Sequence, residues 1–256
     1  MPVGPVAVVT GGSSGIGAAV ARRLTAKGWS CVLVARNEER LRAVAEELDA
    51  EYELCDVGDR AAVDRMAATV TERHPTVKLL VNSAGLSGRT PGDRRRKGFI
   101  ESDPEWIEEL LRINFLGAVW CLRAFVPALE AAGPAHVINV ASVAGTVAVP
   151  PGLYAATKHA LVAFSRSTAA SLPAHGIHVH TVNPGFVETP GFPQRGVLGS
   201  RLLEAAVVSP EYAARRIVSA VERNRPEIFV PGWYRVPAAL QALAPGLVSR
   251  VLARRR

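Results

Sequence analysis

The amino-acid sequence predicts an α/β protein built as one domain around a doubly wound, parallel sheet. Short runs rich in β-branched residues alternate with longer stretches of helical periodicity along most of the 256 residues. A glycine-rich turn, Thr10 to Gly17, directly follows the first of these runs. Strands that alternate with helices pair in parallel, and their helical crossovers cover both faces of the sheet. In such folds ligands bind beyond the carboxyl ends of the strands.

The same patterns place each element along the chain. Strands are predicted at residues 6–9, 31–34, 77–81, 136–140 and 178–182, with a weaker strand at 51–54 and a last one at 227–230. Helices are predicted at residues 15–27, 38–50, 59–73, 104–130, 152–172 and 209–223. Two irregular segments, 86–101 and 190–208, are expected to form walls of a substrate pocket. No linker interrupts the chain, so we expect one domain over residues 1–232 and a tail over residues 233–256.

Composition argues against several classes of protein. No apolar run approaches the roughly 18 residues that cross a bilayer, and the start, Met-Pro-Val-Gly-Pro, lacks the basic region of a signal peptide. Cys31, Cys55 and Cys121 are widely spaced and odd in number, which favours reduced thiols in a cytoplasmic protein. His178 and His180 are expected to share a strand face, but no His-Glu-x-x-His motif is present, so no metal site is predicted.

The formal net charge of +7 raises the question of a nucleic-acid partner. Lys and Arg are scattered except for the clusters Arg94–Lys97 and Arg254–Arg256, and aromatic residues make up only 6% of the chain. Without a stacking platform or a reading helix, no nucleic-acid partner is predicted. The excess positive charge instead favours anionic ligands.

The turn after the first strand has the composition of a phosphate-binding loop. Its glycines at positions 11, 15 and 17 let the backbone turn tightly and approach a pyrophosphate closely, and the following helix offers free N–H groups to the negative charge. The spacing differs from the Gly-x-Gly-x-x-Gly fingerprint. The residues expected to hold the cofactor here are Gly11, Ser13, Ser14, Gly15, Ile16 and Gly17.

The end of the second predicted strand indicates which dinucleotide binds. Proteins that bind NAD usually carry Asp or Glu near this point, where a carboxylate holds the ribose 2′-hydroxyl and repels a 2′-phosphate. Here the apolar Ala35 is followed by Arg36. A guanidinium forms charge-assisted bonds with a phosphate, so NADP is predicted over NAD. The alternative is a surface arginine at the start of a helix.

Tyr154 and Lys158 form the pattern most indicative of catalysis. In a helix over residues 152–172, positions four apart lie on one face, so the Lys158 ammonium can approach the Tyr154 phenol. A free tyrosine has a pKa of about 10, and a nearby cation lowers that value toward the range of a general acid or base. Ser142 lies twelve residues upstream of Tyr154, at the end of a predicted strand.

Taken together, these motifs resemble the single-domain short-chain dehydrogenase/reductase family, from about Val6 to Pro231. The turn is similar to the family's Thr-Gly-x-x-x-Gly-x-Gly motif. Asn82-Ser83-Ala84-Gly85 is similar to its Asn-Asn-Ala-Gly segment, with Ser83 in place of the second Asn. The resemblance implies a Rossmann fold, a catalytic tetrad of Asn114, Ser142, Tyr154 and Lys158, and further cofactor contacts from Asp56, Val57, Asn82, Ala84, Gly85, Tyr154, Lys158, Pro184, Gly185, Val187 and Thr189.

This resemblance implies an NADP-dependent oxidoreductase that transfers a hydride between the nicotinamide and a small-molecule carbonyl or alcohol with an apolar body. Ser142 would polarise the carbonyl, Tyr154 would exchange the proton, Lys158 would hold the ribose, and Asn114 would anchor a water that links Lys158 to solvent. It also implies a homodimer or homotetramer. Two alternatives stay open: a 3-oxoacyl-carrier-protein reductase, and a non-catalytic NADP-binding redox sensor.

The tail after residue 232 is amphipathic and cationic. Trp233, Leu240, Leu243 and Leu247 supply apolar surface, and the chain ends in three arginines. Such a segment can lie on an anionic membrane surface. The prediction we favour is that it packs on its own protein, closing the substrate pocket, or on a neighbouring subunit.

Overall fold

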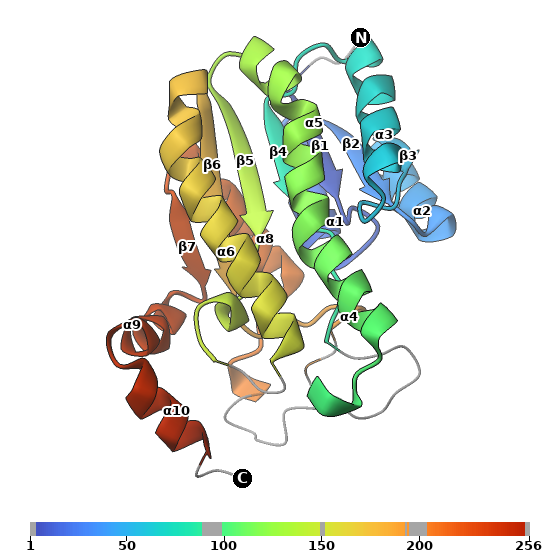
Figure 1. The fold of residues 1–256 in the computed structure, drawn as a ribbon. Coiled ribbons are helices and arrows are strands. Elements are labelled where there is room, and N and C mark those ends of the chain that lie inside the picture. The colour runs from blue at the N-terminus through green and yellow to red at the C-terminus, as the bar shows by residue number, and fades with distance from the viewer. Residues whose placement is uncertain (1–3, 89–98, 149–151, 193, 195–203, 254–256) are drawn as a thin grey trace.

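The computed structural model describes residues 4–88, 99–148, 152–192, 194 and 204–253. They form a parallel sheet of seven strands in the order β3-β2-β1-β4-β5-β6-β7, with helices on both faces (Figure 1). The strands are β1 (Val6–Thr10), β2 (Ser30–Ala35), β3 (Glu51–Leu54), β4 (Leu79–Asn82), β5 (Ala135–Val140), β6 (Ile177–Pro184) and β7 (Glu227–Val230). The predicted Rossmann-type α/β fold is confirmed.

The helices follow the predicted alternation. They are α1 (Gly15–Thr25), α2 (Glu38–Leu48), α3 (Arg60–Arg73), α4 (Pro104–Leu111), α5 (Gly117–Ala131), α6 (Leu153–Ser171), α8 (Pro210–Glu222), α9 (Arg235–Leu243) and α10 (Pro245–Ala253). Short helical turns lie at Phe99–Glu101, Val143–Gly145, Leu172–His175 and Gly232–Tyr234, and a π-helical turn lies at Arg112–Leu116.

Two hydrophobic layers hold the helices to the sheet. On one face, Leu24 of α1 and Ile217 of α8 pack with Leu33 of β2. On the other face, Phe125 of α5 packs with Leu80 of β4. These side chains are at most 1% exposed, and burying each large apolar side chain contributes about 1.5–3 kcal/mol.

The central strand β4 starts two residues later than predicted. Val77 is fully buried, but its N–H donates to the carbonyl oxygen of Ala128 in α5 at 3.0 Å instead of to a strand. Val77 therefore belongs to the core without belonging to the sheet. Apolar character alone does not distinguish these two cases.

The predicted helix at 104–130 is continuous but irregular. A π-helical turn at Arg112–Leu116 separates α4 from α5, and Asn114 lies within it. By length and composition, the stretch Pro104–Ala131 is apolar enough to cross a membrane, and it is the one described helix that passes this test. Its α5 half, however, packs on α3 and the sheet through Cys121 and Phe125, which are fully buried. The stretch is thus a core helix of the domain.

The tail divides into a packed side and an exposed side. Tyr234 and Ala238 pack with Val143 and Phe229, as expected for a tail that contacts its own protein. The leucines expected to close the pocket do not do so, since Leu240, Leu243 and Leu247 are 56%, 84% and 63% exposed. The helical period places Leu240 and Leu243 on the face of α9 opposite Ala238, and Leu247 lies in α10, which packs chiefly on α9.

Candidate active site

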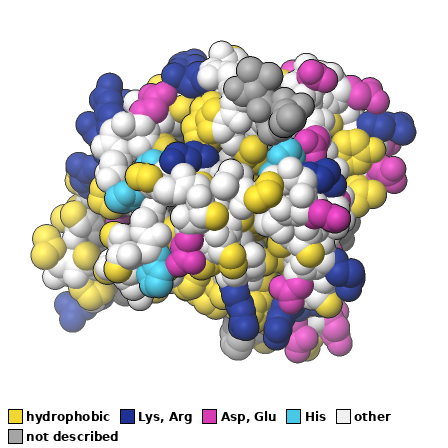
Figure 2. Space-filling view, turned by 90° about the horizontal axis from the view of Figure 1, so that it is seen from above, with side chains coloured by type: hydrophobic (Ala, Val, Ile, Leu, Met, Phe, Trp, Pro, Cys, Tyr) yellow, Lys and Arg dark blue, Asp and Glu magenta, His cyan; other side chains and the backbone are white. Residues whose placement is uncertain are grey.

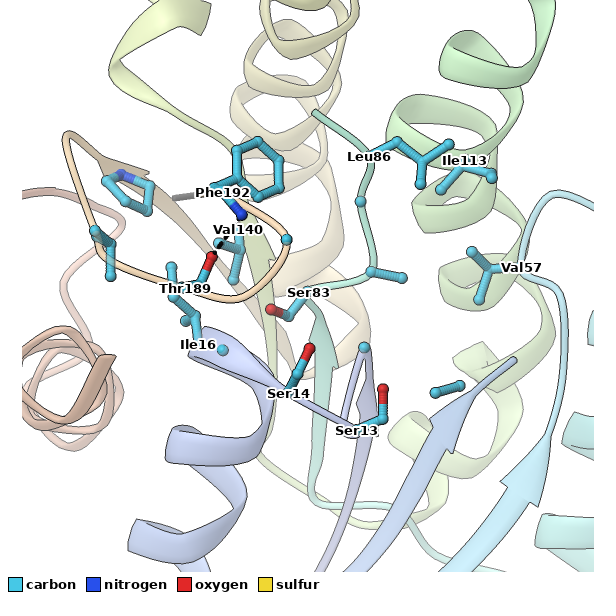
Figure 3. Close-up of a pocket in the computed structure, with 18 of the residues that line it drawn as sticks. Ser13, Ser14, Ile16, Val57, Ser83, Leu86, Ile113, Val140, Thr189 and Phe192 are labelled. Atoms are coloured by element: carbon cyan, nitrogen blue, oxygen red, sulfur yellow. Dashed lines mark hydrogen bonds between the residues drawn. The ribbon is translucent and has the colours of Figure 1, made fainter. Parts of the chain in front are cut away.

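A cavity of about 380 Å³ lies at the carboxyl ends of the strands. Its walls come from the turns that follow β1, β2, β4, β5 and β6, and from the first turns of α6. In Figure 3, Ser13 and Ser14 lie on one side of this cavity, Val57 and Ile113 on another, and the loop with Thr189 and Phe192 crosses over it. The fold thus brings together motifs that are far apart in the sequence.

The glycine-rich turn after β1 forms part of the cavity wall. Gly11 and Gly15 have φ angles of +68° and +56°, which only glycine adopts readily. A Cβ atom on Gly17 would collide with the carbonyl oxygen of Gly11, so α1 can begin this close to the turn only with glycine there. Gly17 therefore shapes the turn from behind and does not line the cavity.

The start of α1 is suited to an anion. Ser14 is the N-cap residue, but its hydroxyl makes no capping bond, and no acidic residue lies in the first turn. The free N–H groups at a helix N-terminus carry partial positive charge. Together with the Ser13 and Ser14 hydroxyls, they form a concave, electropositive surface that fits a pyrophosphate.

Arg36 lines the cavity just beyond β2, the strand that neighbours β1. Its guanidinium Nη1 is 3.5 Å from Asp56 Oδ2 and 3.5 Å from Glu109 Oε1, and about half of the side chain is exposed. Arg40, in the first turn of α2, lines the same part of the cavity. Sequence reasoning missed Arg40, although its position one helical turn after Arg36 was a usable signal.

Asn82 supports the cavity without lining it. It is 4% exposed, and its Nδ2 donates to Asn139 Oδ1 at 2.9 Å. Asn139 Nδ2 in turn donates to Ser165 Oγ at 3.1 Å, so the pair links β4 and β5 to α6. The turn after β4 is fixed separately, because Thr10 Oγ1 accepts from the N–H groups of Ser83 and Ala84 at 3.1 and 3.2 Å.

Asn114 also lies behind the wall of the cavity. It is 1% exposed, and its amide pairs with the Leu86 backbone, accepting from the N–H at 2.7 Å and donating to the carbonyl at 3.0 Å. Its Nδ2 also approaches Thr157 Oγ1 at 3.2 Å. The π-helical turn brings this amide toward the turn after β4, so Asn114 fixes the segment that carries Gly85 and Leu86.

Ser142, Tyr154 and Lys158 meet at the centre of the cavity. Ser142 Oγ lies 3.5 Å from the carbonyl oxygen of Pro184 and accepts from the Ala144 N–H at 3.1 Å. The Lys158 Nζ atom lies 5.9 Å from the centre of the Tyr154 ring, as the predicted spacing of four residues requires. The structure thus brings these three predicted residues together in one cavity.

Lys158 is a buried cation. It is 4% exposed, and its ammonium donates to the carbonyl oxygen of Val140 at 3.0 Å. Burial disfavours the charged form and lowers the pKa of Lys158 from 10.5 to about 8. The ammonium still predominates at neutral pH, close to the point at which it would release a proton.

The segment after β6 covers the cavity. Thr189 Oγ1 accepts from the N–H of Phe192 at 3.1 Å, shown as the dashed line in Figure 3, and the Phe192 ring lies 5.8 Å from that of Tyr154. On its outer side, Gly185 touches the ring of Tyr234 so closely that any side chain at position 185 would collide with it. The tail thus braces the Pro-Gly turn from behind.

Most predicted site residues line the cavity. They are Gly11, Ser13, Ser14, Gly15, Ile16, Arg36, Asp56, Val57, Ala84, Gly85, Ser142, Tyr154, Lys158, Pro184, Gly185, Val187 and Thr189. Phe192 was expected as an apolar wall residue and lines the cavity, but besides Arg40, sequence reasoning missed Leu86, Ile113 and Gln194 as individual wall residues, since they carry no motif. Much of the predicted walls, at 89–98 and 195–203, and the clusters Arg94–Lys97 and Arg254–Arg256 lie outside the described residues.

Histidines gather at the other end of the sheet. His178 and His180 share a face of β6, and His136 Nδ1 on β5 lies 2.9 Å from His180 Nε2. Burial and the neighbouring histidines lower the pKa of His136 to about 4. Within the described part of the chain, no group of three or more His, Cys, Asp or Glu residues is arranged to hold a metal ion.

Comparison with known proteins is consistent with this site. A family model described as short chain dehydrogenase matches residues 5–196. An uncharacterised oxidoreductase of Staphylococcus epidermidis is 35% identical over 211 residues, covering 79% of this chain and 89% of that protein. A short chain dehydrogenase/reductase of Burkholderia phymatum in complex with NAD superposes with a TM-score of 0.83 at 27% identity, covering 95% of each chain. The actinorhodin polyketide ketoreductase with NADPH superposes with a TM-score of 0.75 at 28% identity, covering 86% of this chain and 90% of that one.

Proposed function

Because this chain belongs to the short chain dehydrogenase family of oxidoreductases, we propose that it interconverts a carbonyl and an alcohol with NADP(H). The observation that carries this proposal is the meeting of Ser142, Tyr154 and Lys158 in one cavity with a phosphate-binding turn. Such a grouping supplies a hydrogen-bond donor, a proton donor and a cation around one reacting centre.

The cavity fits a dinucleotide. Gly11 and Gly15, at positive φ, and the uncapped start of α1 form a cradle that side chains would fill. Ser13, Ser14 and the backbone of the turn would hold the pyrophosphate, and the segment from Pro184 to Thr189 would hold the nicotinamide end. When bound, the nicotinamide supplies or accepts the hydride.

Ser142 and Tyr154 act on the oxygen of the substrate. Their side chains line the same cavity, so a carbonyl oxygen placed between them would accept hydrogen bonds from both hydroxyls. Donors fixed in advance at that point stabilise the negative charge that develops on the oxygen during reduction. Tyr154 then delivers its proton to that oxygen, and in the oxidising direction it takes the proton back.

Lys158 keeps positive charge beside Tyr154. The Val140 carbonyl holds the ammonium in place at 3.0 Å, and burial strengthens its field on the phenol because few water molecules screen it. A cation near a phenol favours the ionised form and eases proton release. Asn114 acts differently: as a positioning residue, it holds the Leu86 backbone at the rim.

Arg36 and Arg40 support a preference for NADP. Both line the cavity just beyond β2, where the 2′-phosphate of an adenosine ribose would lie. The carboxylates of Asp56 and Glu109 neutralise part of the charge on Arg36. A 2′-phosphate would form shorter, charge-assisted bonds with the guanidinium than these two contacts of 3.5 Å.

A panel of carbonyl and alcohol substrates, assayed with NADPH and with NADH, tests this function. Absorbance of the reduced nicotinamide reports turnover, and titration of each cofactor gives its dissociation constant. We expect reduction of ketones or aldehydes with an apolar body, since Leu86, Ile113 and Phe192 line the cavity. Turnover with neither cofactor on any carbonyl, despite tight NADPH binding, would favour a non-catalytic redox sensor.

A second candidate is a reductase of carrier-bound 3-oxoacyl groups. The structural likeness to actinorhodin polyketide ketoreductase favours it, and the net charge of +7 suits an acidic carrier protein. Turnover on an acyl-carrier thioester far above that on free ketones of the same chain length would select this candidate.

We place the enzyme in the cytoplasm as a homodimer or homotetramer. Cys31, Cys55 and Cys121 are all free and buried, and burial raises their pKa values, which suits thiols kept reduced. Light scattering on the purified protein measures the assembly size.

A further inference from the structure

The start of the tail, α9 and the turn before it, carries two opposite stripes. Tyr234 and Ala238, spaced four residues apart, are 6% and 9% exposed and face the sheet. Val236, Leu240 and Leu243, at spacings of four and three, are 63%, 56% and 84% exposed. Only the buried stripe packs on the protein. The exposed stripe, which we call the outer stripe, lacks a partner within the described chain.

The outer stripe continues on both sides of the helix. Leu247 in α10 is 63% exposed, and Trp233, in the turn before α9, is 50% exposed and stacked on Tyr234 with ring centres 3.7 Å apart. These five side chains make up most of the large hydrophobic residues exposed in the described structure. We call them the tail stripe. An apolar concentration of this size marks an interaction surface.

The charge of the tail indicates what would cover the stripe. Residues 228–256 contain five arginines and no Asp or Glu, so this segment supplies five of the seven excess positive charges of the protein. Arg235 and Arg250 lie in the two tail helices and are exposed. Two copies meeting tail to tail would bring Arg235 and Arg250 of each copy together without an Asp or Glu from the tail, which argues against a symmetric contact between copies.

The tail projects from the body of the molecule. In Figure 1, α9 and α10 lie at one corner, beyond the carboxyl ends of the strands, and α10 packs chiefly on α9. Figure 2 shows hydrophobic side chains gathered at the left edge, the side on which these helices lie in Figure 1, while charges of both signs are interspersed over the rest of that view. The tail stripe therefore lies at the periphery of the molecule.

We propose that the tail binds an anionic phospholipid surface, with the tail stripe inserted at the level of the headgroups and Arg235 and Arg250 paired with lipid phosphates. Apolar burial and attraction between arginines and anionic lipids act together in such contacts. Tryptophan beside leucine suits this depth because an indole has an apolar body and a polar N–H. The cavity is lined by residues at the carboxyl ends of the strands, and α9 and α10 lie beyond the same ends in Figure 1, so bound protein would hold its active site on the lipid side.

Co-sedimentation with vesicles tests the proposal on the full-length protein. One set of vesicles contains phosphatidylcholine alone, and the other contains phosphatidylcholine mixed with phosphatidylserine. We expect binding to the anionic vesicles only, weakening as sodium chloride screens the arginines. Leu243→Glu should lower the partition coefficient by at least about tenfold, because it removes an inserted side chain and adds a repelled charge.

Leu54→Glu is the matched control. Leu54 lies at the end of β3, away from the tail, is 48% exposed, and undergoes the same chemical change. Leu54→Glu should bind vesicles within about twofold of the parent, and thermal unfolding should show that both variants fold. Equal binding of the parent to both vesicle types, no binding to either, or an equal loss in both variants would overturn the proposal. A smaller assembly size in Leu243→Glu alone, with unchanged vesicle binding, would assign the stripe to a second copy of the chain instead.

Discussion

Lys158→Met should change how stability depends on pH, because Lys158 is a cation buried at the candidate active site. Burial lowers the pKa of Lys158 from 10.5 to about 8. Between these values the unfolded chain holds a proton that the folded chain has released, so the free energy of unfolding rises with pH across this window. Below about pH 8 both states are charged, and the full cost of burying the charge is present.

The size of this effect follows from the shift. One pKa unit corresponds to about 1.4 kcal/mol, so the buried charge costs about 3 kcal/mol near pH 7. Most of this cost disappears by about pH 10. Methionine has a similar length and no charge, so the variant lacks this pH dependence. It also loses the 3.0 Å bond to the Val140 carbonyl, which shifts the stability of the variant without adding a titration of its own.

Urea unfolding of the cofactor-free parent and of Lys158→Met, at about pH 7 and about pH 10, measures the difference. The parent should gain about 2–3 kcal/mol relative to the variant as pH rises. Lys27→Met is the control, since Lys27 is 39% exposed and paired with Glu222, and its difference should stay within about 1 kcal/mol. Parallel pH curves for the parent and Lys158→Met would show that the folded protein does not depress the pKa of this lysine.

Three further predictions concern residues in or behind the wall of the cavity. Arg36→Ala should weaken NADPH binding by about 1.5–3 kcal/mol and NADH binding far less, as isothermal titration would show; equal losses would refute the phosphate contact. Asn114→Ala should release the Leu86 backbone and lower kcat by tenfold or more, with a pH profile unchanged in shape if its role is positioning. Gly185→Ala should lower stability by about 1–3 kcal/mol in thermal unfolding, because the new methyl group meets Tyr234; an unchanged Tm would mean that the tail yields freely.

The fold was predictable because the alternation of short apolar runs with helical stretches repeats along the chain. Each strand pairs in parallel with a neighbour that came from the same kind of apolar run, and the two core layers follow from helices between those runs. The exceptions are local. Val77 is apolar but bonds to α5 instead of a strand, and a π-helical turn interrupts the pattern of a single long helix where Asn114 reaches the Leu86 backbone.

The site was predictable where chemistry requires particular residues. Glycines with positive φ and the pair Tyr154 and Lys158 have few substitutes, so their pattern can be read from the sequence alone. The burial of each motif residue was not predictable, since a motif does not say that Asn82 faces the interior and Gly85 the cavity. Nor does the pattern of the tail leucines say which stripe of α9 meets the protein, because both stripes are apolar.

Single-turnover oxidation of bound NADPH, in the parent and in Tyr154→Phe, tests the proposed chemistry most directly. The variant keeps the ring beside Phe192 and Lys158 and loses only the hydroxyl that lines the cavity. NADPH affinity should stay within a few-fold, while the rate of hydride transfer to a good carbonyl substrate should fall by about 10²–10⁴. If Tyr154→Phe transferred hydride at nearly the parent rate with NADPH fully bound, Tyr154 would not be the proton donor.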